Sequence, residues 1–243
     1  MKDTHWLQRT ELLIKKDRLE KLMKSNVLIV GMGGVGSFAA EFIARAGVGK
    51  ITIVDGDVVD PTNRNRQLPA LSTTHGVGKV DWMHERLMAI NPELELTVIK
   101  EFLQIQRVKE IVLNGKYDYV VDAIDSITPK LTLISTCYNN RIPLISSMGA
   151  GAKLDPTQIR VVDISKTHNC KLAQYVRKRL KKYKIYKGVK TVFSPEKAPP
   201  DSLMFTDGTN YKKSAYGTIS YLPAAFGGVA ASVVIRDLIE WDK

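Results

Sequence analysis

Short apolar runs alternate with longer amphipathic segments through the first 150 residues of the chain. The runs are rich in β-branched residues, whereas the segments between them repeat apolar side chains at helical spacing. This pattern predicts strands at 27–31, 51–55, 94–100, 118–122 and 143–146, and helices at 36–46, 76–90, 106–113 and 129–140. Regular alternation of the two predicts an α/β fold, with a doubly wound, mostly parallel sheet and helices on both faces.

The rest of the chain extends this predicted unit without a visible linker, so residues 1–243 are expected to form one domain. The further predicted parts are a helical arm at 1–24, strand at 152–154 and 159–163, a basic insertion at 166–192, and a C-terminal part at 193–243.

One apolar stretch, residues 221–235, bears on membrane association. It is shorter than the roughly 20 residues that a bilayer span needs. It also contains Pro223, Gly227 and Gly228. We expect a buried, closely packed helix and no stable membrane insertion, with membrane association as the alternative. No signal peptide is visible at the polar N-terminus, and we expect a cytoplasmic protein.

The first predicted strand leads directly into a glycine-rich turn that contains Gly31, Gly33, Gly34 and Gly36. A predicted helix and a second strand follow, and Asp55 comes 19 residues after Gly36. Such glycines let the backbone approach phosphate groups, and the helix N-terminus attracts the anion. An acid about 20 residues further on binds a ribose hydroxyl. The order predicts a Rossmann-like nucleotide site; a turn shaped for packing alone is the alternative.

A cluster of polar and basic residues follows Asp55. Asn63, Arg66 and Gln67 come first, and Lys79 comes after two glycines. A nicotinamide-dependent dehydrogenase has no use for such a cluster, whereas nucleotidyl transfer needs the charge of a triphosphate to be neutralised. The cluster therefore favours ATP chemistry over hydride transfer.

The glycine turn, Asp55-Gly56-Asp57, the Asn63–Gln67 spacing and Gly76 with Lys79 resemble the ThiF/MoeB-like adenylating enzymes, which are related to ubiquitin activators. Further motifs narrow the resemblance to the tRNA threonylcarbamoyladenosine dehydratases, which cyclise a hypermodified adenosine beside the anticodon. These motifs are Asp122-Ala123-Ile124-Asp125-Ser126, Asn140–Ile145, Gly149-Ala150-Gly151, Leu154–Ile159 and Ala224–Ser232. The structural C-x-x-C pairs of the branch that activates ubiquitin-like proteins are not in this sequence.

The resemblance implies an enzyme that uses ATP and Mg²⁺ to adenylate the threonyl carboxylate of N-threonylcarbamoyladenosine in tRNA, with release of pyrophosphate and, on ring closure, AMP. It distributes the roles as follows: Asn63, Arg66 and Lys79 at the triphosphate, Gln67 in the nucleotide site, Asp125 at magnesium, and Asp57 and Asp122 as supports.

The resemblance also implies partners. Arg9 resembles an arginine that family members insert into the phosphate site of a second subunit, which implies a homodimer. An ordinary surface arginine is the alternative. A sulfur-relay protein is a further candidate partner.

The net charge of +11 comes largely from residues 171–190, which contain nine lysines and arginines and no acid. Three tyrosines are interleaved with these cations. Unbalanced cations with aromatic residues are typical of RNA-binding segments. The candidate tRNA contacts are Arg177, Lys178, Arg179, Lys181, Lys182 and Lys184. A solvent-facing basic loop without a partner is the alternative.

The two cysteines form no metal or disulfide pattern. Cys137 lies on an apolar helical pattern and is expected in the core, whereas Cys170 is expected in a polar loop, where a reactive thiol is the minor interpretation. Activation of a small protein's C-terminus remains the alternative function. An RNA-binding protein that merely retains the fold would have lost some phosphate-site residues, and none is missing here.

Overall fold

The computed structural model describes residues 4–205 and 214–241. It contains a seven-stranded sheet in the order β3-β2-β1-β4-β5-β7-β6, in which β6 is antiparallel to β7 and the other pairs are parallel. The strands are β1 (Asn26–Val30), β2 (Lys50–Val54), β3 (Glu95–Ile99), β4 (Tyr119–Asp122), β5 (Leu144–Ser147), β6 (Arg160–Asp163) and β7 (Lys190–Phe193). The short strands β8 (Leu203–Phe205) and β9 (Ser214–Tyr216) pair separately.

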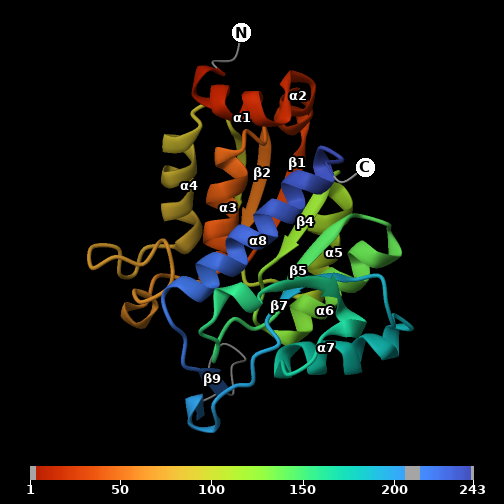
Figure 1. The fold of residues 1–243 in the computed structure, drawn as a ribbon. Helices are drawn as coiled ribbons and strands as arrows, with labels where there is room; N and C mark the ends of the chain where they lie inside the picture. Colours follow the sequence, from red (N-terminus) through yellow and green to blue (C-terminus); the bar gives the residue numbers. More distant parts are fainter. Residues whose placement is uncertain (1–3, 206–213, 242–243) are drawn as a thin grey trace.

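The helices are α1 (Gln8–Ile14), α2 (Lys16–Lys24), α3 (Gly36–Arg45), α4 (Lys79–Ile90), α5 (Ile105–Asn114), α6 (Ile127–Asn139), α7 (Lys171–Leu180) and α8 (Tyr221–Leu238). Figure 1 shows α3, α4 and α8 in front of the sheet, with α5 and α6 on the other side. The predicted doubly wound α/β architecture is therefore confirmed, and the predicted arm at 1–24 forms α1 and α2.

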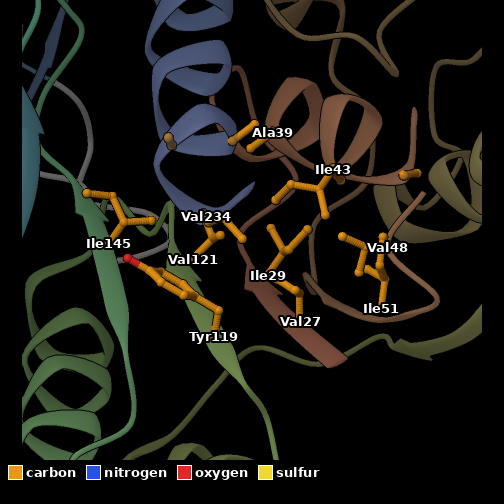
Figure 2. Close-up of a cluster of buried hydrophobic side chains, with 14 of the residues drawn as sticks. Val27, Ile29, Ala39, Ile43, Val48, Ile51, Tyr119, Val121, Ile145 and Val234 are labelled. Atoms are coloured by element: carbon orange, nitrogen blue, oxygen red, sulfur yellow. The ribbon is translucent and has the colours of Figure 1, made fainter. Parts of the chain in front are cut away.

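Alternate strand residues supply the two faces of the sheet with apolar side chains. Val27 and Ile29 of β1 belong to the core that contains α3 and α8, whereas Leu28 and Val30 belong to the core under α5 and α6. Figure 2 shows the first of these cores, where Val121 of β4 lies beside β1 beneath the two helices. Burial of both faces accounts for the continuous apolar runs of these strands.

The stretch at 221–235 lies within α8, which is long and apolar enough to cross a membrane by length and composition. Half of it is buried inside the protein. A Cβ on Gly227 would stand 2.6 Å from the carbonyl oxygen of Val35 and 3.0 Å from the Cβ of Phe38, so α8 approaches α3 closely. The predicted buried, closely packed helix is confirmed.

Three sequence predictions were wrong in detail. Residues 152–154 are not a strand, because Ala152 has a φ of +58° and its N–H bonds the carbonyl oxygen of Gly217 instead of a neighbouring strand. The helix predicted from residue 76 begins at Lys79, because residues 76–78 pair with Val58 and Val59. The end of the basic insertion forms β7, which lies inside the sheet between β5 and β6.

The strand order reverses between β1 and β4, because β2 and β3 extend the sheet on one side and β5 on the other. In open α/β sheets, ligands bind outside the carboxyl ends of the strands at such a point. The glycine turn follows β1, Asp55 follows β2, and Asp122 ends β4. The fold thus gathers the predicted nucleotide residues at one edge.

Candidate nucleotide-binding site

The turn after β1 brings backbone N–H groups to this edge. Gly31 has a φ of +95°, and its N–H donates to the carbonyl oxygen of Val54 (2.8 Å). A Cβ on Gly36 would overlap the carbonyl oxygen of Gly31, so the turn requires glycine there too. Gly36 begins α3, where the N–H of Ser37 donates to the carbonyl oxygen of Gly33 (3.2 Å) and the N–H of Ala39 donates to that of Val35 (3.0 Å). Gly33 and Gly34 complete the turn, which has the form that the predicted phosphate contact requires.

Asp55 follows β2 and is fixed by backbone N–H groups. Its two carboxylate oxygens accept from the N–H of Met32 (2.6 Å) and the N–H of Asp57 (2.8 Å). Burial raises the pKa of Asp55, while the charge of Lys79 and the two N–H groups act in the opposite direction. Each oxygen keeps a lone pair for a further donor. This is the geometry that the predicted ribose contact requires.

A partly buried ion pair lies next to Asp55. Lys79 Nζ is 2.8 Å from Asp57 Oδ2, and the Lys79 side chain is only 6% exposed. The N–H of Lys79 also donates to the carbonyl oxygen of Asp57 (3.0 Å), which ties the start of α4 to the end of β2. The predicted phosphate ligand and its predicted support thus touch. A phosphate oxygen that approached would share the ammonium with Asp57.

Asn63 ends a short 3₁₀ helix, Pro61–Asn63, at the start of the loop that carries Arg66. Asp60 caps this helix, and Asn63 Oδ1 accepts from the N–H of Asp60 (3.3 Å). The backbone of Arg66 then comes close to the glycine turn, because a Cβ on Gly34 would stand 3.1 Å from the Arg66 carbonyl oxygen. The loop and the turn therefore form two walls of one site.

Arg66 is held within that loop. Its Nη1 donates to the carbonyl oxygen of Thr62 (2.9 Å) and to Asn65 Oδ1 (2.8 Å). Burial lowers the pKa of Arg66, and the carboxylates of Asp125 and Asp60 oppose that shift. Asp125 is exposed on the loop after β4 and within electrostatic reach of this guanidinium. The charges of Arg66 and Asp125 thus influence one another.

Gln67 carries a buried side-chain oxygen, Oε1, without a hydrogen-bond partner, and it is unique in this among the described residues. Its Nε2 stands 3.7 Å from the point where a Cβ of Gly33 would lie. Buried polar groups are normally satisfied in native proteins. An orphaned oxygen beside an anion-binding turn fits a site that a ligand completes.

Asp122 ends β4 but lies inside the protein, with no exposed surface. Its Oδ2 accepts from Lys130 Nζ (2.7 Å) and Ser146 Oγ (2.5 Å), and its Oδ1 accepts from the N–H of Ile124 (3.1 Å). These contacts favour the supporting role of Asp122 over direct contact with a nucleotide. Sequence reasoning did not identify Lys130, whose signal was a single charged residue in an otherwise uncharged helix.

Arg9 lies at the opposite end of the sheet. It is exposed on α1, which with α2 lies where β1 and β2 begin, as Figure 1 shows. Leu7 and Leu19 flank Gly47, and the N–H of Gly49 donates to the carbonyl oxygen of Leu22, both just before β2. The structure therefore does not bring Arg9 to the site of its own chain, where the other predicted residues meet.

The ThiF family profile matches residues 7–243. This chain belongs to the ThiF family. It is 50% identical to the tRNA threonylcarbamoyladenosine dehydratase of Bacillus subtilis over 192 residues, which cover 79% of this chain and 75% of that protein.

Solved structures agree with this membership. The ThiF-family chain superposes on Escherichia coli TcdA, a tRNA N6-threonylcarbamoyladenosine dehydratase in complex with ATP, with a TM-score of 0.89 and 37% identity, covering 100% of this chain and 98% of that one. The complex of TcdA with AMP gives a TM-score of 0.87 and 38% identity, covering 99% and 98%. Binding of ATP and of AMP is therefore a property of TcdA, which this ThiF-family protein matches along nearly its whole length.

A second candidate surface of this ThiF-family protein is the predicted basic insertion. Its centre is α7 and the 3₁₀ helix Lys181–Tyr183, with Ala173, Val176 and Leu180 buried against the rest of the protein. The exposed side, here called the basic face, consists of Lys178, Arg179, Lys181, Lys182, Lys184 and Lys187. Tyr175, Tyr183 and Tyr186 are exposed between them (56%, 51% and 63%).

The segment that carries the basic face is closed at its base. It leaves β6 after Asp163 and returns at Lys190, and these two residues are register partners in the sheet. The N–H of Gly188 donates to Asp163 Oδ2 (2.6 Å), and the N–H of Ile164 donates to the carbonyl oxygen of Val189 (2.8 Å). A Cβ on Gly149, in the loop after β5, would lie 3.8 Å from Cys170 Sγ, so the segment starts beside the carboxyl edge of the sheet.

Arg177 differs from the other predicted RNA contacts. It is only partly exposed, and its Nη1 donates to Thr167 Oγ1. The side chain therefore ties α7 to the preceding loop, and its contribution to a surface for RNA is smaller than the sequence suggests.

The cysteines offer no chemistry of the kind that a thioester mechanism needs. Cys137 is in the core, as predicted, and burial together with the charge of Asp122 raises its pKa to about 12. Cys170 is buried at the start of α7, not exposed in a polar loop as expected. Within residues 4–205 and 214–241 no group of three or more His, Cys, Asp or Glu side chains could hold a metal ion.

Proposed function

We propose that this protein is an ATP-dependent tRNA threonylcarbamoyladenosine dehydratase that cyclises the modified adenosine beside the anticodon. The observation that carries the proposal is the single site in which a glycine turn, Asp55, Arg66 and Lys79 converge at the β1–β4 switch point. The match to the dehydratase of Bacillus subtilis over 79% of this chain and the full-length match to that of Escherichia coli support the choice of substrate.

The reaction is the activation of a carboxylate. The threonyl carboxylate attacks the α-phosphorus of ATP, an acyl–O–P bond forms, and the bond to the β-phosphate breaks with release of pyrophosphate. An atom of the carbamoyl group of the substrate then attacks the activated carbonyl, and AMP leaves as the ring closes. One water is lost from the nucleoside, and its oxygen departs in AMP. These steps need positioning and charge neutralisation, and no covalent nucleophile from the protein.

The described side chains suit these needs. The N–H groups of the glycine turn and of α3 would hold phosphate oxygens, and Asp55 would accept from the ribose hydroxyls. Arg66, Lys79 and Asn63 would neutralise and orient the triphosphate. Lys79 would exchange part of its bond with Asp57 for a phosphate oxygen.

Magnesium is proposed to come with ATP. Mg²⁺ is usually bound by one or two carboxylates together with substrate phosphates, so a cluster of protein ligands is not required. Asp125, which is exposed and within electrostatic reach of Arg66, is the residue that would hold it. The ion would supply charge neutralisation at the leaving pyrophosphate.

A second subunit is part of the proposal, because Arg9 lies at the far end of the sheet from Arg66 and would act in the site of a partner. Mixing Arg9→Ala with Arg66→Ala subunits tests this, since one site of a heterodimer would contain both arginines. The mixture should regain about a quarter of the wild-type rate, as random pairing makes half of the dimers mixed with one complete site each. A mixture no more active than its components contradicts the Arg9 role.

The tRNA is proposed to bind across the basic face, with the exposed tyrosines available to stack on unpaired bases. This segment starts beside the carboxyl edge of the sheet, which supports a tRNA position that reaches the proposed nucleotide site. A sulfur-relay protein partner and a cytoplasmic location remain proposals from the family resemblance.

The test is mass spectrometry of nucleosides from tRNA carrying threonylcarbamoyladenosine, after incubation with the protein, ATP and magnesium. We expect ATP-dependent loss of one water from that nucleoside, absent with Arg66→Ala and retained with Lys109→Ala, a matched exposed cation on α5. An unchanged nucleoside contradicts the proposal. Pyrophosphate exchange driven by a peptide C-terminus would instead assign the protein to the branch that activates small proteins.

A further inference from the structure

The buried cluster of Asp122, Lys130 and Ser146 has no role in the chemistry proposed above. Asp122 and Lys130 have 0% exposed side chains, and their charged atoms are 2.7 Å apart. Ser146 is the register partner of Asp122 on β5, and its hydroxyl donates to the same carboxylate oxygen. The cluster thus joins α6, β4 and β5 at the carboxyl edge of the sheet.

A contribution to stability is a weak explanation for the buried ion pair of Asp122 and Lys130. Moving two charges out of water costs several kcal/mol per ion, and apolar replacements of similar volume are often as stable. The bond from Lys130 occupies Asp122 Oδ2, while Oδ1 accepts from the N–H of Ile124 (3.1 Å). The lysine therefore orients the carboxylate toward the loop at 123–125.

That loop packs against the glycine turn. The carbonyl oxygen of Ala123 is 2.7 Å from the point where a Cβ of Gly31 would lie, and the Cβ of Ala123 is 3.1 Å from the same point on Gly36. The N–H of Ala123 donates to the carbonyl oxygen of Val30 (2.9 Å). Asp125 at the end of the loop lies within electrostatic reach of Arg66. A shift of this loop would move both the turn and Asp125.

We infer that Lys130 is a positioning residue of the nucleotide site, which acts through Asp122 to hold the loop at 123–125 against the glycine turn. It touches no reacting atom, and its effect on the nucleotide is transmitted through Asp122 and the backbone of Ile124. This inference rests on the proposed function only as far as ATP binding. The reaction on tRNA is not needed to test it.

The test compares ATP affinity by calorimetry in wild type, Lys130→Met and the control Leu133→Met, a volume-conserving change of a buried neighbour on α6. Lys130→Met keeps the length of the side chain and removes its charge. We expect ATP to bind at least about tenfold more weakly, because displacement of supporting groups by about 1 Å has effects of that size or larger. Leu133→Met should bind ATP within about twofold of wild type.

A second variant covers the case in which Lys130→Met does not fold, since it leaves a buried carboxylate unpaired. The double variant Asp122→Asn/Lys130→Met removes both charges and should give a cooperative thermal transition, yet it should keep the weakened ATP affinity. ATP binding within twofold of wild type by either folded variant overturns the inference. A protein that binds ATP normally but does not dehydrate tRNA would instead contradict the proposed function and leave the role of Lys130 standing.

Discussion

In the nucleotide site the charged side chains are held by protein partners, whereas on the basic face they lie exposed. Asp55 accepts two backbone N–H bonds, and Lys79 is paired with Asp57. The six cations of the basic face form no ion pair with any residue that the structure describes. The side chains of the candidate nucleotide site are therefore held in place without a ligand. The cations of the basic face are free to adapt to a polyanion in several orientations.

This difference separates two tasks that the same protein is proposed to perform. Positioning a phosphorus atom for attack requires fixed donors, which lose little on reorganisation at the moment of reaction. Binding a large, flexible polyanion requires only a field of one sign, and its strength depends on salt. Variants in the two regions should therefore fail in different measurements.

The largest effect is expected from Arg66→Ala. Removal of one preorganised donor typically costs about 10²–10³ in rate. We expect a loss of that size in kcat/KM for dehydration, measured by nucleoside mass spectrometry, with tRNA affinity within about twofold of wild type. Equal loss of tRNA binding would mean that the two regions are not separate.

A double neutralisation on the basic face, Lys181→Ser/Lys182→Ser, should have the reverse signature. The slope of log Kd for tRNA against log salt should fall by about 1–2, because one phosphate contact is lost per lysine. ATP affinity should stay as in wild type. The control Lys24→Ser/Lys109→Ser removes the same charge outside the basic face. If the salt slope falls as much in this control, the effect comes from net charge and not from the basic face.

Within the basic insertion, Arg177→Ala and Lys178→Ala should differ. Arg177 donates to Thr167 and is partly buried, so its loss should lower the free energy of unfolding by about 1–2 kcal/mol. Lys178 is exposed, and its loss should change that free energy by at most about 0.5 kcal/mol while weakening tRNA binding. Denaturant unfolding and filter binding measure the two effects. The converse result would place Arg177 on the binding surface.

The smallest expected effect is in the pH dependence of stability. Burial raises the pKa of Asp55 above its ordinary 3.8, so the folded state holds the proton more tightly than the unfolded state. The contribution of Asp55 to the free energy of unfolding is therefore highest below pH 3.8 and falls as pH rises through the raised pKa. Relative to Asp55→Asn, wild type should lose stability across that window, as denaturant unfolding at each pH would measure. A difference independent of pH contradicts the raised pKa.

The sequence predicted the nucleotide edge well because its signals are local. The strand before Gly31, the glycine turn, the helix after it and Asp55 are close together in the chain, and each depends on backbone geometry that few residue types can adopt. The doubly wound fold followed from the same alternation. Asn63, Arg66 and Lys79 are also near in sequence, and the fold places the backbone of Arg66 beside this turn and Lys79 against Asp57.

What the sequence did not predict depends on partners that are distant in the chain. Lysines are almost never fully buried unless they are paired. Lys130 of α6 is buried because its Nζ donates to Asp122 of β4 and Ser146 of β5. Strand β7 follows a run of cations and gains its place only by pairing with β5 and β6. Residues 152–154 read as a strand, but the bond from Ala152 to Gly217 could not be foreseen from local pattern.

The two ends of the basic insertion are fixed next to each other by the sheet. Since Asp163 and Lys190 meet across the β6–β7 register, everything between them is an excursion whose ends are fixed by the sheet. Ala173, Val176 and Leu180 of α7 pack into the core, so only the exposed side chains of this excursion can change in charge and aromatic content without disturbing the sheet. The proposed tRNA contacts can therefore vary in evolution independently of the proposed ATP site.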